Sequence, residues 1–327
     1  MHKRAETKWF RKCGWGVFCH YLAGMPSYGL KRELTAEQWN RQVNAVDVEA
    51  LAETLEGVRA PYFFITVGQN TGFYCAPNPT YDRLTGIRPS KCSRRDLISD
   101  LYDALRPRGI KLLVYLPASA PGRDKAAAKK LLWEPVVNKS TGQRTKKRMA
   151  AFQRRWEAVI RDWSVRWGRK VRGWWNDGCY FPDEMYRHKN PPNFASFAAA
   201  MKAGNPQAIV AFNPGVDKVI CMSEHEDYTA GELSCVLPVS KSNWPPREID
   251  GTVDGAQWHT LNYLGTFWRR GDKPRFPDSL VIAYTQYIIG LGGVVTWDVP
   301  ITAKGVIPRP FIRQLTALGK AIRRRKQ

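Results

Sequence analysis

The sequence contains no apolar run approaching the roughly 18 residues that a membrane-spanning helix needs. Its amino terminus, MHKRAETKWF, is basic, but no apolar segment follows, so no signal peptide is visible. We therefore expect no membrane contact. Two locations stay open: the cytoplasm, or the periplasm or exterior if a signal was removed ahead of residue 1.

Cysteine is too sparse and too irregularly spaced for a zinc ribbon or a disulfide framework. The chain has seven cysteines, an odd number, and none forms a C-x-x-C pair. Phosphate-binding motifs are missing as well. Neither G-x-G-x-x-G nor G-x-x-x-x-G-K-[ST] follows a predicted strand, which disfavours a nucleotide-binding open sheet.

Acidic residues are scarce relative to basic ones. The 51 Lys and Arg face 29 Asp and Glu, which gives a formal net charge of +22. Such a charge attracts anionic partners, so three interpretations arise: a nucleic-acid-binding protein, an enzyme on an anionic polymer, or a basic surface without a role. No RNP pattern, zinc finger or helix-turn-helix signature accompanies the charge, so we expect no nucleic acid.

What the sequence does contain is an alternation of short apolar runs with helix-like segments. The runs are near-continuously apolar, which is typical of parallel strands buried on both faces. They cover residues 14–21, 62–69, 110–117, 171–179, 208–213, 219–223, 257–264 and 293–299. The alternation predicts the α/β class and a (β/α)8 TIM-like barrel, with an open doubly wound sheet as the alternative. Active sites of such barrels lie at the carboxyl ends of the strands.

Helices are predicted between these runs from apolar spacing and capping residues. One begins at Asp47 and ends near Gly57, and a capping-box-like S-R-R-D begins another at Ser93. Further helices are expected from an apolar stripe at 152–167 and at 279–291 and 310–323.

One segment interrupts the alternation. Residues 124–148 hold a short Ala/Lys helix and then the basic stretch NKSTGQRTKKR. We interpret this segment as an excursion on the barrel rim. Residues 1–327 are therefore expected to form a single catalytic barrel domain that carries this excursion.

Two groups of carboxylates follow predicted strands. Asp177 ends the run WWND just before a glycine, which places it at the barrel mouth, although a helix cap or turn would also use an Asp there. The second group holds Glu224, Glu226, Asp227 and Glu232. Its spacing does not match an EF-hand, and it could bind a cation, act as an acid/base or face water.

Glycoside hydrolysis requires two carboxyl groups, and Asp177 and Glu232 can converge from neighbouring loops at the mouth. Polar groups suited to bind sugar hydroxyls stand at other strand ends, namely His20, Gln69 and Asn70. Three tryptophans could form an apolar wall for a sugar, or instead pack in the core. They are Trp175, Trp258 and Trp297.

Along nearly its whole length the sequence resembles glycoside hydrolase family 29, the retaining α-L-fucosidases. The opening WFRKCGWGVFCHY looks like the family's first strand with its substrate-contacting His, here His20, and GIKLLVY looks like the strand that carries a Tyr, here Tyr115. WWNDG resembles the nucleophile strand, and DYTAGE resembles the Asp-Phe-x-Thr-x-Glu loop. The resemblance implies Asp177 as nucleophile and Glu232 as acid/base.

The resemblance further implies an exo-acting retaining enzyme that forms a covalent glycosyl-enzyme and needs no metal or cofactor. Glu224 and Glu226 are alternative acid/base residues. The family's His-His pair is Gln69-Asn70 here, which changes the donors and acceptors offered to the sugar. No C-terminal β-sandwich is expected. The expected partner is an oligosaccharide or polysaccharide, and the positive charge favours an anionic or sulfated one. A non-catalytic carbohydrate-binding relative is the alternative.

Overall fold

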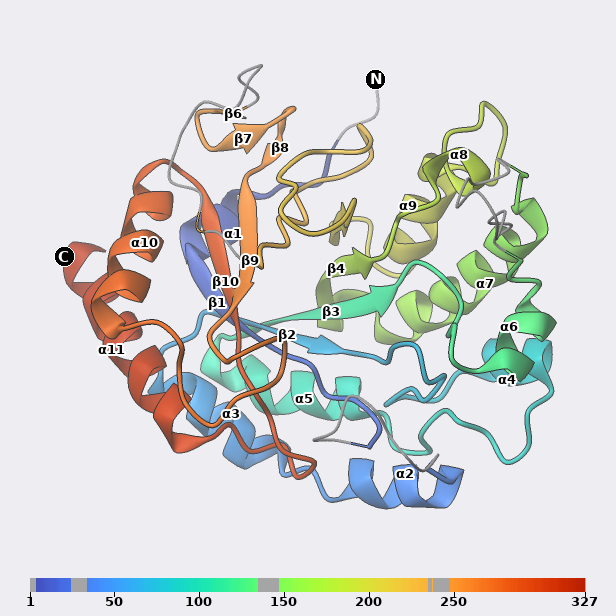
Figure 1. Cartoon of the computed structure of the whole chain (residues 1–327), viewed down its shortest axis with the longest axis horizontal. Helices are drawn as coiled ribbons and strands as arrows, with labels where there is room; N and C mark the ends of the chain where they lie inside the picture. Colours follow the sequence, from blue (N-terminus) through green and yellow to red (C-terminus); the bar gives the residue numbers. More distant parts are fainter. Residues whose placement is uncertain (1–3, 25–33, 135–146, 235–236, 238–247, 327) are drawn as a thin grey trace.

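The computed structural model describes residues 4–24, 34–134, 147–234, 237 and 248–326. Seven parallel strands form a curled sheet whose outer face is covered by helices (Figure 1). The strands are β1 (Trp15–Cys19), β2 (Tyr62–Thr66), β3 (Lys111–Pro117), β4 (Val171–Asp177), β5 (Ile209–Phe212), β9 (His259–Tyr263) and β10 (Val294–Asp298). Their order is β5-β4-β3-β2-β1-β10-β9. The predicted α/β barrel is confirmed, and the open doubly wound alternative is not.

Helices separate most of the strands along the chain. They are α1 (Lys8–Cys13), α2 (Ala36–Asn44), α3 (Val48–Gly57), α4 (Pro79–Thr85), α5 (Leu97–Leu105), α6 (Lys125–Leu131), α7 (Ala150–Trp167), α8 (Pro182–Met185), α9 (Phe194–Lys202), α10 (Asp278–Gly290) and α11 (Arg309–Lys326). No helix in the described part of the chain is both long enough and apolar enough to cross a membrane.

The segment 227–233 occupies the eighth position of the barrel. Its backbone pairs with β9: the Leu261 amide donates to Gly231 (2.8 Å), and the Leu233 amide donates to Leu261 (2.8 Å). Gly231 has φ +58°, and a Cβ there would lie 2.0 Å from a backbone oxygen of β9, so only glycine allows this approach. On its other side, the Asp227 amide donates to Val210 of β5 (2.8 Å).

The strand predicted at 219–223 is wrong. Those residues form no strand and are only partly buried, whereas Tyr228 and Ala230 of the segment 227–233 are fully buried. The apolar run at 219–223 is too short to separate a strand from a partly covered loop.

The inward side chains of the strands fill the barrel and form a small core of their own. Phe18, Phe64, Tyr115 and Trp175 belong to it, and Phe10 of α1 packs in the same core. The larger core lies between the strands and the surrounding helices. The two cores therefore follow the strand alternation between inward and outward faces.

The predicted helices are confirmed, with one shifted start. The Asp47 side chain caps α3 by accepting from the Ala50 amide (3.0 Å). The helix expected from Ser93 begins only at Leu97 because Asp96 is its cap. The Ser93 amide instead donates to Tyr74 (2.8 Å) in a preceding turn.

Two further segments complete the chain. The predicted excursion at 124–148 begins with α6, whereas its basic residues 135–146 lie outside the described residues. A small antiparallel sheet that the sequence did not predict precedes β9. It consists of β6 (Glu248–Ile249), β7 (Thr252–Val253) and β8 (Ala256–Gln257).

Candidate active site

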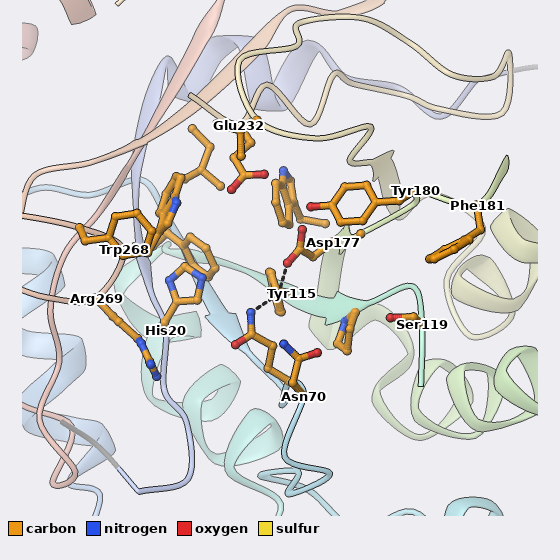
Figure 2. A pocket seen from close by; sticks show the side chains of 18 residues that line it. His20, Asn70, Tyr115, Ser119, Asp177, Tyr180, Phe181, Glu232, Trp268 and Arg269 are labelled. Carbon is orange, nitrogen blue, oxygen red and sulfur yellow. Dashed lines mark hydrogen bonds between the residues drawn. The ribbon is translucent and has the colours of Figure 1, made fainter. Parts of the chain in front are cut away.

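A cavity of about 340 Å³ opens at the carboxyl ends of the barrel strands (Figure 2). Seven of the residues predicted for the site line it, namely His20, Gln69, Asn70, Tyr115, Trp175, Asp177 and Glu232. They come from separate strands and loops that the parallel barrel brings to one end. The fold therefore gathers these seven predicted residues around a single space.

Asp177 is the last residue of β4, and both of its carboxylate oxygens accept hydrogen bonds. The Tyr115 hydroxyl donates to Oδ2 (2.5 Å), and the Asn213 amide donates to Oδ1 (2.9 Å). Gln69 in turn donates to the Tyr115 hydroxyl (2.6 Å). Burial and the adjacent Asp177 raise the pKa of Tyr115 well above its usual value, so its hydroxyl stays protonated and continues to donate.

Glu232 reaches the same cavity from the segment 227–233. The Asn213 side-chain amide donates to its Oε2 (2.5 Å) as well as to Asp177. Since both acceptor oxygens bond to one nitrogen, they lie at most about 5.4 Å apart, the sum of 2.9 and 2.5 Å. Burial and the charge of Asp177 raise the pKa of Glu232 to about 7, while the Asn213 bond lowers it. The site therefore holds two close acids with different environments.

Asn213 itself was not identified from the sequence. It directly follows β5, and its own amide donates to Asn176 of β4 (2.8 Å), which fixes its position beside Asp177. The sequence feature that could have indicated Asn213 is its position as the polar last residue of the apolar run AIVAFN.

The opposite side of the cavity is built around His20. Its Nδ1 lies 2.8 Å from Oδ1 of Asp298, a buried residue at the end of β10, so Nδ1–H donates and Nε2 is left for a ligand. The other Asp298 oxygen accepts from the Arg269 amide (2.7 Å). Trp268 and Arg269 line this side as well. The sequence analysis identified His20 but missed Asp298, Trp268 and Arg269.

The prediction that Trp258 and Trp297 line the sugar site is wrong. Trp258 and Trp297 are buried in the core between strands and helices and do not line the cavity. Successive strand residues face opposite sides, so the inward Asp298 requires Trp297 to point outward. Its Nε1 donates there to Thr285 of α10 (3.0 Å). Trp175 does line the cavity, stacked on Tyr115 at 5.4 Å between ring centroids.

The two alternative acid/base residues lie away from the cavity. Glu224 is exposed and lines a separate surface hollow. Glu226 is fully buried, and its carboxyl accepts from the backbone amides of Phe212 (2.9 Å), Met222 (2.5 Å) and Ser223 (3.0 Å). Its burial raises its pKa to about 8. Glu226 therefore binds backbone amides of the loop and does not face the cavity.

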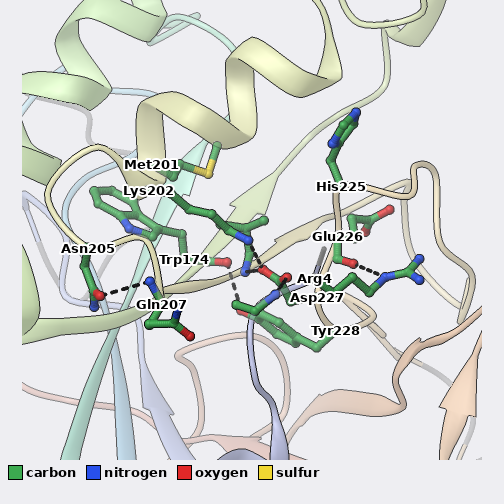
Figure 3. Close-up of polar contacts among 12 residues, drawn as sticks. Arg4, Trp174, Met201, Lys202, Asn205, Gln207, His225, Glu226, Asp227 and Tyr228 are labelled. Atoms are coloured by element: carbon green, nitrogen blue, oxygen red, sulfur yellow. Dashed lines mark hydrogen bonds and ion pairs between the residues drawn. The ribbon is translucent and has the colours of Figure 1, made fainter. Parts of the chain in front are cut away.

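Asp227, the fourth acid of this group, has a structural partner too. Its carboxylate pairs with Lys202 of α9 (2.7 Å) and accepts from the amides of Val210 (2.9 Å) and Ala5 (2.6 Å) (Figure 3). Arg4 donates to the Glu226 carbonyl (2.6 Å) in the same region. No three His, Cys, Asp or Glu side chains within the described ranges gather as metal ligands.

The fold and this cavity define a barrel protein with a pair of carboxyl groups at its mouth. No family model and no curated protein matches the sequence. Several solved structures have a similar fold. The endo-fucoidan hydrolase MfFcnA4 of glycoside hydrolase family 107 superimposes with a TM-score of 0.69 at 15% identity, over 97% of this chain and 53% of the MfFcnA4 chain. The related endo-fucoidan hydrolase P5AFcnA gives 0.67 at 16%, over 97% and 93%.

The fold is also similar to that of an α-L-fucosidase. The α-L-fucosidase AlfC from Lactobacillus casei, solved with its fucose product, gives a TM-score of 0.63 at 12% identity, over 98% of this chain and 99% of its own. The chain spans about half the length of MfFcnA4 and 63% of that of its relative MfFcnA9. At such identities the likeness shows the barrel fold, and the chemistry has to be argued from the cavity.

Proposed function

We propose that the chain is a retaining, exo-acting glycoside hydrolase that removes fucose or a fucose-like sugar from a glycan. The observation that carries this proposal is the acid pair Asp177 and Glu232, bridged by the single amide of Asn213. The barrel likeness to an α-L-fucosidase and to endo-fucoidan hydrolases supports the choice of sugar.

The spacing of the pair favours retention. Retaining enzymes hold their two carboxyl groups about 5–5.5 Å apart, whereas inverting enzymes leave about 6.5–9.5 Å for a water. The two oxygens that share Asn213 lie at most about 5.4 Å apart, which is less than the separation that inversion needs. Asp177 can therefore attack the anomeric carbon itself rather than activate a water.

In the first step an Asp177 oxygen bonds to the anomeric carbon while the glycosidic C–O bond breaks. Glu232, whose pKa is raised to about 7, gives its proton to the departing oxygen. In the second step the Glu232 carboxylate takes a proton from water. The water oxygen then bonds to the anomeric carbon and releases Asp177. Tyr115 and Asn213 hold the Asp177 carboxylate in place through both steps.

The cavity size favours one sugar at the chain end. Its volume of about 340 Å³ lies at the lower end of the range of about 300–1,000 Å³ for ligand pockets. Polar groups from His20, Gln69 and Asn70 meet the sugar hydroxyls, and Trp268 offers an apolar face. The pair Gln69-Asn70 offers amide donors and acceptors in place of imidazoles.

The test is a set of aryl glycosides, with p-nitrophenyl α-L-fucoside beside the α-L-galactoside. We expect Asp177→Asn to lower kcat by about 10³-fold or more, because the variant lacks the carboxylate that attacks the anomeric carbon. With Asp177→Gly, added azide should restore turnover and give the β-glycosyl azide. Glu224→Gln is the matched control and should retain activity.

Near-native turnover by Asp177→Asn would remove the nucleophile role. Binding of fucose by the native chain without turnover of any glycoside in the set would instead favour a non-catalytic sugar-binding protein.

A further inference from the structure

A second hollow of about 610 Å³ adjoins the catalytic cavity. Tyr180 and Val216 line both spaces, so the two lie side by side. The hollow lies between the loop after β4 and the residues 214–222 that follow β5. The hollow is therefore the space that a ligand longer than the cavity would meet on this side.

The hollow lies on the side of Glu232. The Asp217 amide donates to the Glu232 carbonyl (2.7 Å), and the Asp217 carboxylate accepts from the Ser234 amide (2.8 Å). These bonds tie the wall of the hollow to the residue that protonates the departing oxygen. In the proposed mechanism the leaving part of the glycan must lie next to that acid, so we name this hollow the leaving-group groove.

The leaving-group groove is basic. Lys218 and Arg187 line it, and its lining contains no carboxylate. Arg187 forms an ion pair with Asp183 (3.2 Å). Within the described residues Lys218 forms no ion pair. Lys218 is exposed at the surface. An anionic group in the groove would therefore meet an ammonium group whose charge no neighbour neutralises.

An aromatic surface stands beside this charge. Tyr180 is 39% exposed, which is high for a side chain that lines a cavity. Gly215 lies between the two: a Cβ there would be 3.7 Å from the Tyr180 ring and 3.8 Å from the Lys218 ammonium nitrogen. The missing side chain at Gly215 keeps the floor between ring and ammonium open. A ring with an adjacent cation suits a sugar unit that bears an anionic substituent.

We propose that the leaving-group groove binds the sugar next to the scissile bond, and that Lys218 selects units that carry an anion such as a sulfate ester or a carboxylate. This inference rests on the proposed function, since that function defines which side of the cavity the leaving sugar occupies. It makes Lys218 a specificity-determining residue rather than a part of the bond-breaking machinery.

The experiment measures binding by calorimetry in an Asp177→Asn background, so that no probe is hydrolysed. The probes are three α-linked fuco-oligosaccharides of equal length: one neutral, one sulfated only on the penultimate sugar, and one sulfated only on the terminal sugar. Lys218→Glu should lower the preference for the penultimate-sulfated probe over the neutral one about tenfold, as expected for one lost ion pair. Lys218→Arg should keep that preference.

Lys320→Glu on α11 is the matched control, because it makes the same charge change at an exposed position away from the groove. If Lys218→Glu and Lys320→Glu show the same preference for the penultimate-sulfated probe over the neutral one, the proposed role of the groove is overturned. A loss of affinity confined to the terminal-sulfated probe would overturn it as well. A fourth probe with a uronic acid as its penultimate sugar separates carboxylate from sulfate recognition. Turnover of p-nitrophenyl α-L-fucoside by the native chain tests the proposed function independently, since calorimetry needs no catalysis.

Discussion

Asn213 is the hydrogen-bond donor that the two acids of the site share. One side-chain amide carries two hydrogens, and here one points to Asp177 and the other to Glu232. A bridging donor stabilises negative charge on both acceptors and fixes their separation. Its removal should therefore change the geometry of the pair and the acidity of Glu232 at once.

Asn213→Ala removes the bonds to both acids and should lower kcat by about 10–100-fold, because the bond to the charged Asp177 alone is worth about 1.5–3 kcal/mol. Because the Asn213 bond lowers the pKa of Glu232, its loss should move the alkaline limb of the kcat/KM profile to higher pH. The pH profile of the purified variant checks this, with thermal unfolding as the control for folding. An unmoved limb would show that Asn213 does not tune the acid.

In the proposed mechanism the acidity of Glu232 sets the upper pH limit of the reaction. Glu232 must be protonated to act as acid, and burial with the neighbouring Asp177 raises its pKa to about 7. Below that pH the proton is present, and above it the proton is lost. We therefore expect kcat/KM for a natural oligosaccharide to fall about tenfold per pH unit above 7, as one ionisation requires.

The matched variant is Glu232→Gln, which has no proton to lose and should show no alkaline limb. An aryl glycoside with an acidic phenol as leaving group needs less protonation, so it should depend less on pH. Activity of the native chain on the oligosaccharide that stays constant to pH 9 would contradict the role of Glu232.

The sequence could predict residues whose position follows from strand ends alone. Asp177 and His20 follow apolar runs, and both line the cavity as expected. Asn213 and Asp298 carry the same signal, but a single polar residue at the end of an apolar run does not distinguish a site residue from a turn residue. Trp297 could not be assigned, because a fully apolar parallel strand gives no alternation to distinguish its two faces.

Among the elements, the connection 213–233 decides whether the site forms, because it carries both Asn213 and Glu232. The buried carboxyl of Glu226 holds this connection together from inside. It ties the amide of Phe212 at the end of β5 to those of Met222 and Ser223 across the loop. One side chain thus replaces the ladder bonds that an ordinary strand would supply.

Glu226→Gln should lower the free energy of unfolding by about 1–3 kcal/mol, because the amide nitrogen cannot accept from the backbone and leaves buried N–H groups unpaired. Glu224→Gln, at an exposed position two residues away, should change it by less than about 0.5 kcal/mol. Chemical denaturation at one pH compares the two. Equal stabilities would mean that Glu226 does not organise the connection.

This connection is also where the sequence predicted the elements least well. Seven of the eight strands lie where apolar runs predicted them, but the eighth position is filled by 227–233 instead of 219–223. The filling segment includes Asp227 and Thr229, which are buried with hydrogen-bond partners and so look polar in sequence. Local apolarity cannot predict a strand whose polar residues are satisfied by distant parts of the fold.

For the whole molecule, the decisive property is the excess of positive charge. The chain has a formal net charge of +22, although its cavity contains two acids, and the leaving-group groove beside the cavity is lined by Lys218 and Arg187. A long-range field raises the encounter rate with anionic chains, whereas a single ion pair acts only after contact. The two contributions differ in their dependence on salt.

The encounter contribution predicts a strong effect of ionic strength on anionic substrates. The screening length falls from about 30 Å at 0.01 M salt to about 8 Å at 0.15 M, so the field attracts anionic chains over a much shorter distance. Between these concentrations kcat/KM for a sulfated oligosaccharide should fall about tenfold, while that for neutral p-nitrophenyl α-L-fucoside changes less than twofold. Lys320→Glu lowers the net charge without touching the groove, so it should reduce this salt dependence only slightly. An equal response of both substrates to salt would mean that the positive surface has no part in substrate capture, and only the local contact at Lys218 could then account for a preference for anionic glycans.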